Sequence, residues 1–270
     1  MVEYRGTSRA GQRWAGALYA PVRGGYTRPV ASISVRTALV LAGGRGERLR
    51  PLTDDRPKPM VPLNGTPILE HHLRWLRENG IARAVLLTGY RHEVIEEYFS
   101  TPRIDGLDVE TVVETSPLGR GGALRNGFEQ AGIADEFVVG TNGDVLTDQP
   151  LAPLIALHAQ TGALATLMLT RAVSPFGVVE VDELGLVRGF VEKPRLDHWI
   201  NAGAYILSAE AFARFPAEGD HETSTFPELA EAGRLAAYRS ERYWKSVESA
   251  KDLREAGEYL AAHPLGGREG

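Results

Sequence analysis

A glycine-rich segment early in the chain carries residue types that could bind phosphate. Residues 41–49 read Leu-Ala-Gly-Gly-Arg-Gly-Glu-Arg-Leu, and residues 57–59 read Pro-Lys-Pro. Glycines let backbone N–H groups approach phosphate oxygens, and arginine and lysine side chains neutralise the phosphate charge. The Gly-Lys-Ser/Thr ending of a Walker A loop is absent, and Leu49 stands where a dinucleotide-binding loop has its third glycine. The segment therefore predicts a phosphate site of another kind, and the alternative is an arginine-rich surface loop.

Apolar runs before and after this segment predict the elements that would position it. Residues 37–42 form a short apolar run, typical of a buried parallel strand that ends at the glycines. Strands alternate with helices, which predicts a mainly parallel sheet with helices on both faces. We expect strands at 84–88, 109–113, 136–139 and 163–170, and helices at 67–79, 93–99, 121–131 and 151–160.

After residue 170 the pattern becomes richer in strands. Residues 177–181 and 186–191 are separated by a turn-like Asp-Glu-Leu-Gly segment, which predicts a hairpin. We expect a further strand at 204–207, extended chain at 235–238, and helices at 210–215, 227–232 and 251–262. The predicted fold class is α/β, a Rossmann-like three-layer sandwich with a mainly parallel central sheet and a β-rich insertion.

Composition excludes several classes of protein. The chain has 270 residues, a net charge of −5 and no cysteine, which excludes a disulfide scaffold and a thiolate zinc site. No run approaches the ~18 apolar residues of a membrane span. The acidic balance argues against a nucleic-acid partner. We expect a cytoplasmic protein that does not bind a membrane, and a homo-oligomer stays open.

The first 36 residues differ from the rest, because they contain six arginines and only one acid, Glu3. We expect residues 1–36 to be a basic, flexible extension. A transit peptide and a nucleic-acid-binding arm are the alternatives. Residues 37–264 are predicted to form a single domain, and residues 265–270 a tail.

The two halves of the glycine-rich segment, with their spacing, resemble the signature of the sugar-1-phosphate nucleotidyltransferases, also called NDP-sugar pyrophosphorylases. The family pattern is Leu-Ala-Gly-Gly-x-Gly-x-Arg-Leu followed by Pro-Lys-Pro. Later motifs resemble those of the family in the same order, and they span most of residues 37–262. These motifs are Glu114–Ala123, Gly140–Asp144, Phe176–Val179, Val191–Pro194, Asn201–Tyr205 and the segment from Trp244.

The resemblance implies transfer of a nucleotidyl group from an NTP to a sugar 1-phosphate, with release of pyrophosphate. It implies that Arg48 stabilises the departing pyrophosphate, that Lys58 bridges the reacting phosphates, and that Lys193 contacts the sugar phosphate. The implied sugar-binding residues, part of them in the β-rich insertion, are Gly177, Glu192, Asn201 and Gly203. The implied nucleotide-binding residues are Leu41, Ala42, Gly43, Gly44, Gly46, Glu114, Pro117, Leu118, Gly119 and Gly143.

The resemblance also implies Mg²⁺ as cofactor, with Asp144 as one metal ligand. Many family members place a second metal-binding aspartate two residues after the tryptophan, where this chain has Ser246. Glu248 lies two residues further along and on the same face of an extended segment. We therefore expect Glu248 to be the second metal ligand. The alternative is an exposed Glu248, with Asp144 holding the metal together with phosphates and water.

The substrates are only partly indicated. An acid at position 114, before Pro-Leu-Gly, resembles the pattern found in mannose- and heptose-1-phosphate guanylyltransferases. GTP is therefore favoured over ATP, CTP and UTP as the nucleotide substrate. Arg120 departs from this pattern, because threonine is usual there. The acceptor could be a sugar or a sugar-like cyclitol phosphate. A non-catalytic paralogue that binds nucleotide-sugar is a further alternative, motivated by Ser246.

Overall fold

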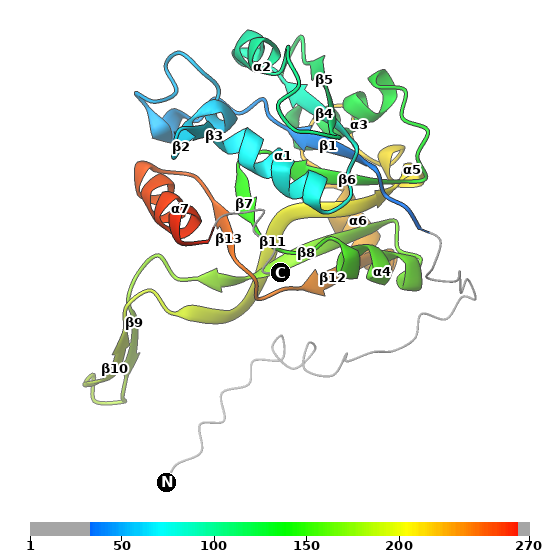
Figure 1. Ribbon diagram of the computed structural model, residues 1–270. Helices are drawn as coiled ribbons and strands as arrows, with labels where there is room; N and C mark the ends of the chain where they lie inside the picture. The colour runs from blue at the N-terminus through cyan, green and yellow to red at the C-terminus, as the bar shows by residue number, and fades with distance from the viewer. Residues whose placement is uncertain (1–32, 264–270) are drawn as a thin grey trace.

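A seven-stranded sheet forms the centre of the computed structural model, which describes residues 33–263 (Figure 1). In order across the sheet, the strands are β12 (Leu235–Arg239), β8 (Ala165–Val173), β11 (Arg195–Ser208), β6 (Phe137–Asn142), β1 (Thr37–Leu41), β4 (Arg83–Thr88) and β5 (Asp108–Val113). Strands β6, β1, β4 and β5 are parallel, as are β12 and β8, whereas β11 is antiparallel to both of its neighbours. The predicted mainly parallel sheet is confirmed.

Strand β1 is buried on both faces, which explains why its sequence is a continuous apolar run. Ala38, Leu39 and Val40 are all fully buried. Ala38 and Val40 belong to the hydrophobic cluster on one face of the sheet, and Leu39 belongs to the cluster on the other face. Successive side chains of a strand point to opposite faces, so a strand that is covered on both faces must be apolar at every position.

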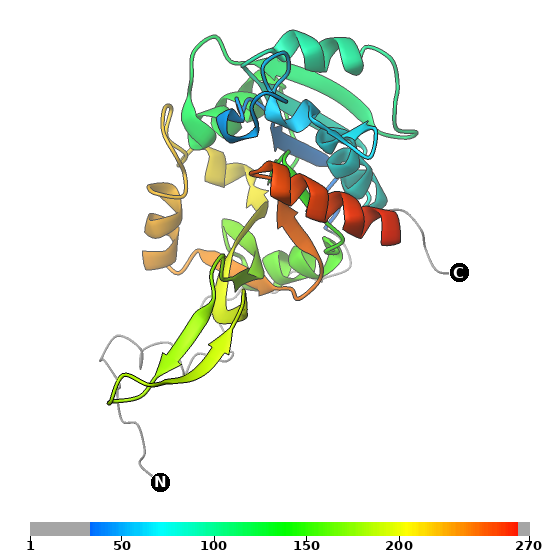
Figure 2. The ribbon, with the colours of Figure 1, turned by 90° about the vertical axis from the view of Figure 1, so that its left-hand side faces the viewer.

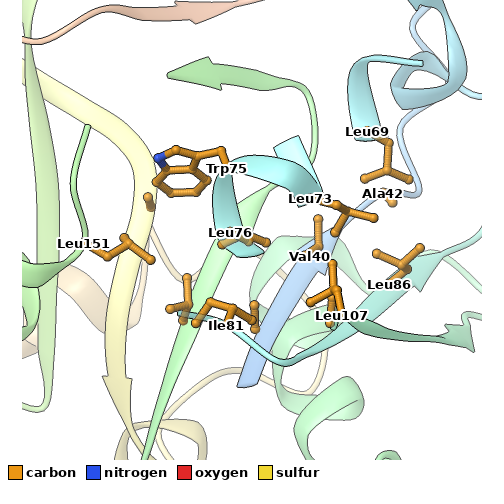
Figure 3. Close-up of a cluster of buried hydrophobic side chains, with 14 of the residues drawn as sticks. Val40, Ala42, Leu69, Leu73, Trp75, Leu76, Ile81, Leu86, Leu107 and Leu151 are labelled. Carbon is orange, nitrogen blue, oxygen red and sulfur yellow. The ribbon is translucent and has the colours of Figure 1, made fainter. Parts of the chain in front are cut away.

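Helices cover both faces of the sheet and complete three layers. On one face, Leu73 packs near Val40 and Leu86 of the sheet (Figure 3). On the other face, Leu124 and Phe212 pack in a second cluster. The predicted three-layer α/β sandwich is confirmed. The helices of the first face are α1 (Ile68–Glu78), α2 (His92–Tyr98) and α4 (Ala152–Thr161), and those of the second are α3 (Gly119–Gln130), α5 (Ala209–Phe212) and α6 (Thr225–Glu231).

Two short ladders and the last helix surround the glycine-rich segment. Leu260 of α7 (Ala250–Ala262) packs with Leu49 and Leu146 in a third cluster. One ladder joins β2 (Pro62–Leu63) to β3 (Thr66–Pro67), and the other joins β7 (Val145–Thr147) to β13 (Trp244–Ser246). Helix α1, predicted to begin at residue 67, begins one residue later because Thr66 and Pro67 form β3.

The predicted hairpin extends away from the body of the molecule (Figures 1 and 2). It consists of β9 (Val178–Val181) and β10 (Val187–Val191), which pair with each other in an antiparallel two-stranded sheet. We call residues 176–191 the hairpin arm. The arm is the β-rich insertion predicted after residue 170.

Residues 1–32 and 264–270 lie outside the described part of the chain. Most of the extension predicted for residues 1–36, and the tail predicted for residues 265–270, therefore stay predictions. None of the helices between residues 33 and 263 combines the length and the apolar character that crossing a bilayer requires.

Candidate active site

The glycine-rich segment closes around Lys58. The Lys58 backbone N–H donates to the carbonyl of Gly44 at 3.0 Å, and the Thr53 hydroxyl donates to the carbonyl of Gly46 at 2.9 Å. Gly46 has a φ of 66°, and a Cβ atom there would lie 2.7 Å from Cβ of Lys58. Only glycine fits both this conformation and this approach. The two sequence motifs are thus one structural unit.

The ammonium of Lys58 lies between two carboxylates. Its Nζ is 2.6 Å from Oδ2 of Asp144 and 2.7 Å from Oε1 of Glu248. The Lys58 side chain is only 9% exposed, and a buried cation requires such partners. Arg48 adds a second cation, because it donates from Nη2 to Oε2 of Glu248 at 2.5 Å. Four of the residues singled out in the sequence therefore form one charged cluster.

The ladder between β7 and β13 brings Glu248 to Asp144. Ser246 pairs with Val145, and the Val247 N–H donates to the carbonyl of Asp144 at 3.2 Å. The Ser246 hydroxyl donates to Oε1 of Glu248 at 3.0 Å. Burial alone would raise the pKa of Glu248, but the hydrogen bond and charge of Lys58 hold it below its usual value. Glu248 is thus an ionised carboxylate beside Asp144.

A buried histidine supports the turn that carries Asp144. Nδ1 of His72 lies 2.8 Å from the carbonyl of Val145, and Nε2 lies 3.2 Å from the Thr141 hydroxyl. Burial lowers the pKa of His72 to about 4, so the ring is neutral at pH 7. The histidine therefore links helix α1 to both sides of the turn without adding charge to the cluster.

The two carboxylates are chemically suited to Mg²⁺. Carboxylate oxygens of Asp144 and Glu248 both lie within 2.7 Å of the same nitrogen, so they converge on one small volume. Mg²⁺ is commonly bound by one or two carboxylates together with substrate phosphates. Within residues 33–263, no group of three or more histidine and acidic side chains could hold a metal by itself. The donor set therefore fits a metal that binds together with a phosphorylated substrate.

Other residues singled out for nucleotide binding lie at one edge of the sheet. Gly43 and Gly44 follow β1, Glu114 follows β5, and Gly143 follows β6. The carboxyl ends of parallel strands meet at this edge, where α/β proteins bind their ligands. The Gly143 N–H donates to the carbonyl of Leu41 at 2.9 Å, so the loops after β1 and β6 are in contact.

Glu114 lies half-buried directly after β5 and before α3 begins. Its Oε2 accepts a hydrogen bond from the Leu118 N–H at 3.2 Å, within the segment that contains Pro117 and Gly119. Burial raises the pKa of Glu114 above its usual value, although the Leu118 hydrogen bond opposes this effect. A hydrogen-bond acceptor is thus available near the glycine loop.

A cavity of about 680 Å³ adjoins the charged cluster at Ser246, which lines it. Asn201 and Gly203 also line the cavity, and the Gly203 N–H donates to Oδ1 of Asn201 at 3.0 Å. Gly203 has a φ of 71°, and a Cβ atom there would lie 2.5 Å from Nδ2 of Asn142. Apolar side chains form much of the remaining wall, including those of Leu167, Ile200, Phe226, Leu235 and Trp244.

The cavity contains a polar network that the sequence did not indicate. Nδ2 of Asn201 donates to Oε1 of Glu222 at 2.8 Å, and the Tyr205 hydroxyl donates to the same oxygen at 3.1 Å. Arg120 binds Oε2 of Glu222 at 2.6 Å and also pairs with Asp220. No recognisable motif surrounds Glu222 in the sequence. Its role depends on contacts with segments that are distant along the chain.

Three residues singled out for sugar or phosphate contact lie elsewhere. Gly177, Glu192 and Lys193 are absent from the cavity lining. Gly177 belongs to the hairpin arm, and Glu192 and Lys193 follow it with side chains that are 59% and 44% exposed. The sequence also missed Asn142, which lines the cavity and stands two residues before Asp144. Its place in the Gly140–Asp144 motif is the signal that could have identified it.

Comparison with known proteins identifies a family and several relatives. The family model described as "Nucleotidyl transferase" matches residues 37–263. Mannose-1-phosphate guanylyltransferase of Mycobacterium tuberculosis (strain ATCC 25618 / H37Rv) is 38% identical over 225 residues, which cover 80% of this chain and 62% of that protein. The chain thus spans about three fifths of the length of this relative.

Two further relatives match over nearly their whole length. A probable glucose-1-phosphate cytidylyltransferase of Bacillus subtilis (strain 168) is 34% identical over 245 residues, which cover 81% of this chain and 93% of that protein. The crystal structure of HddC from Yersinia pseudotuberculosis complexed with GMP-PN matches with a TM-score of 0.66 and 25% identity. That match covers 84% of this chain and 100% of the solved one.

Proposed function

The chain belongs to the nucleotidyl transferase family, and we propose that it transfers a nucleotidyl group from an NTP to a sugar 1-phosphate. The observation that carries this proposal is the position of Lys58. The glycine-rich segment encloses its backbone N–H and Cβ, and its ammonium lies between Asp144 and Glu248. Ser246 binds Glu248 and also lines the adjoining cavity. A phosphate-binding loop and a pocket for a second substrate thus share one charged cluster.

The proposed reaction forms one phosphorus–oxygen bond and breaks another. A phosphate oxygen of the sugar 1-phosphate attacks the α-phosphorus of the NTP. The bond from the α-phosphorus to the bridging oxygen breaks in line with the attack, and pyrophosphate leaves with that oxygen. Both reactants are anionic, so catalysis consists mainly of alignment and charge neutralisation.

Lys58 and Arg48 would supply the fixed positive charge. Before metal and substrate bind, Lys58 is held by its two carboxylates, so its side chain is already ordered and loses little conformational entropy when a phosphate binds. The Arg48 side chain is 76% exposed, which leaves it accessible to the departing pyrophosphate. Asp144 and Glu248 would hold Mg²⁺ together with substrate oxygens. The metal, when bound, adds positive charge next to the reacting phosphates.

We propose GTP as the nucleotide. The relative from M. tuberculosis is named a guanylyltransferase, and HddC was crystallised with GMP-PN. Glu114 supports this choice, because a carboxylate can accept hydrogen bonds from the N–H groups of guanine. CTP is the second candidate, favoured by the B. subtilis relative, which this chain matches over 93% of its length.

Pyrophosphate release with Mg²⁺ tests the proposal directly. We would assay GTP, CTP, ATP, UTP and dTTP, each against mannose, glucose and heptose 1-phosphates. Product from GTP and one sugar phosphate is expected, and Lys58→Met should lower its rate by about 1,000-fold. Product from CTP alone would replace the nucleotide assignment. A protein that binds nucleotide but releases no pyrophosphate with any pair would overturn the proposed transfer and favour a nucleotide-sugar-binding role.

A further inference from the structure

Backbone hydrogen bonds join the start of helix α3 to the loop of residues 216–222, which precedes α6. The Gly219 N–H donates to the carbonyl of Leu118 at 2.7 Å, and the Gly121 N–H donates to the carbonyl of Gly219 at 2.8 Å. The first N–H groups of a helix have no partner within the helix, so the loop supplies one. Arg120 stands in the middle of this contact, and its side chain therefore reaches the loop.

The guanidinium of Arg120 lies between two acids of that loop. Its Nε and Nη2 donate to Oδ1 and Oδ2 of Asp220 at 3.1 and 3.0 Å, and its Nη1 lies 2.6 Å from Oε2 of Glu222. The hydrogen bonds from Arg120 hold the pKa of Asp220 below its usual value, so Asp220 is ionised at neutral pH. A paired contact of this kind fixes the plane of the guanidinium, and Asp220 thus holds Arg120 against Glu222.

Glu222 belongs to the wall of the cavity, and its other oxygen is held as well. Oε1 of Glu222 accepts hydrogen bonds from Nδ2 of Asn201 at 2.8 Å and from the Tyr205 hydroxyl at 3.1 Å. Burial and the charge of Glu222 raise the pKa of Tyr205, so this hydroxyl keeps its proton and donates. A carboxylate can accept about four hydrogen bonds, and the contacts with Asn201, Tyr205 and Arg120 account for three. One acceptor position is left for a ligand in the cavity.

We propose that Arg120 is a positioning residue for the acceptor substrate: it holds the carboxylate of Glu222 where this carboxylate accepts a hydrogen bond from a hydroxyl group of the sugar or cyclitol phosphate. The proposal rests on the proposed function, because it assigns the cavity to the acceptor. Arg120 belongs to the segment Glu114–Ala123, which resembles the one beside the nucleobase, yet it lines the cavity together with Glu222. The nucleotide-side segment thus contributes a residue to the acceptor side.

The contacts of Arg120 explain why threonine, the usual residue at this position, would not do the same work. Threonine is short and neutral, so it offers neither the charge nor the fork of N–H groups that Asp220 and Glu222 bind. Without Arg120, Glu222 would keep only the hydrogen bonds at Oε1. Its carboxylate would then rotate more freely, and ordering it again on binding would weaken the affinity for the acceptor.

Steady-state kinetics of Arg120→Thr test the proposal, with the NTP and the mannose, glucose or heptose 1-phosphate that release pyrophosphate in the wild type. The KM for the sugar phosphate should rise about tenfold or more, as is typical when a hydrogen bond to a charged group is lost. The KM for the NTP and kcat should stay nearly unchanged. Arg120→Lys keeps the charge but loses the paired contact with Asp220, so its KM for the sugar phosphate should be intermediate.

Arg125→Thr is the matched control. Arg125 also lies on α3, its Nε donates to Oε1 of Glu129 at 3.0 Å, and its Nη1 donates to the carbonyl of Phe215 at 3.1 Å. It therefore joins α3 to the same part of the chain, but it is absent from the cavity lining. Both KM values should be unchanged in this variant. An equal rise in the KM for the sugar phosphate would show that loosening of α3, and not the contact with Glu222, causes the effect.

The double variant Arg120→Thr/Glu222→Gln tests whether Arg120 acts through Glu222. Its KM for the sugar phosphate should match that of Glu222→Gln alone, because residues that act through one contact are not additive. A product of the two single effects would overturn the assigned route. An unchanged KM for the sugar phosphate in Arg120→Thr, or a rise only in the KM for the NTP, would overturn this inference alone. A wild-type protein without activity would overturn it together with the proposed function.

Discussion

The hydroxyl of Ser246 donates a 3.0 Å hydrogen bond to Oε1 of Glu248, the oxygen that also binds Lys58. Residue 246 is where many family members have a metal-binding aspartate. In this chain the side chain at 246 orients a carboxylate two residues further along the same extended segment. Glu248 thereby reaches Asp144 across the ladder between β7 and β13. In this chain the carboxylate that lies beside Asp144 and Lys58 therefore comes from residue 248 and not from residue 246.

This arrangement predicts a change in the metal requirement of Glu248→Gln. The amide keeps the size of the side chain but removes the charge that would bind Mg²⁺. We expect the Mg²⁺ concentration that gives half-maximal pyrophosphate release to rise about tenfold or more, as is typical when metal sites are weakened. A titration of activity against Mg²⁺ measures this shift.

Glu255→Gln is the matched control for that titration. Glu255 is also an acid paired with a lysine, Lys245, but on helix α7 outside the charged cluster. The Glu255→Gln variant should leave the Mg²⁺ requirement unchanged. If Glu248→Gln leaves it unchanged too, Glu248 is not a metal ligand, and Asp144 holds Mg²⁺ together with phosphates and water.

Gly46 is predicted to be intolerant of any side chain. Gly46→Ala would place a Cβ in the left-handed region, 2.7 Å from Cβ of Lys58. We expect the free energy of unfolding to fall by about 2 kcal/mol, measured by denaturant titration. Gly44→Ala is the control, because nothing lies within 4 Å of a Cβ there. Equal stability losses in the two variants would show that the segment does not close around Lys58.

Glu222 is predicted to act in binding the acceptor substrate. It lines the cavity and accepts hydrogen bonds from Asn201 and Tyr205. Because a hydrogen bond to a charged group contributes about 1.5–3 kcal/mol, Glu222→Gln should raise the KM for the sugar phosphate about tenfold or more. The KM for the NTP should not change, and Glu218→Gln, in the exposed part of the same loop, should alter neither. A rise in both KM values would indicate a general structural role instead.

The strands around the nucleotide side of the site could be predicted because their signals are local. The buried run at residues 37–42 and the glycines after it predict a strand and a loop, and the resemblance of the Pro-Lys-Pro motif implied that Lys58 belongs to the same site. The place of Glu248 was also predictable, because alternation in an extended segment puts it on the face of residue 246, whereas its role as a metal ligand stays a prediction. The structure places its carboxylate 2.7 Å from Lys58.

Contacts between distant segments could not be predicted in this way. Glu222 reaches the cavity only because β11 and the loop before α6 meet there, and one sequence contains no record of that contact. The hairpin arm shows a different limit. Its valine-rich strands have the composition of buried strands, yet Val181 and Val187 are more than half exposed. The composition of these segments predicts that they pair as strands. Whether a face of the paired strands is buried depends on the rest of the fold or on a partner.

His221 predicts how stability depends on pH. It is 1% exposed, and its ring stacks on Phe215, with neither nitrogen bound to a partner. Burial, assisted by the nearby charge of Arg120, lowers its pKa from 6.5 to about 4. The folded state thus favours the neutral ring, while the unfolded state takes up a proton as the pH falls through 6.5. The stability that depends on the neutral ring is fully present above that pH and is lost between pH 6.5 and 4.

The variant His221→Phe isolates this contribution, because the new ring can stack on Phe215 and leaves no hydrogen bond unmade. For one such histidine the expected loss by pH 5 is about 2 kcal/mol. Urea unfolding at pH 7 and pH 5 should therefore show a smaller acid loss in the variant, by about that amount. His158 and His72, whose pKa values burial also lowers to about 4, continue to destabilise both proteins in acid. An identical acid loss in wild type and variant would mean that His221 takes up its proton in the folded state.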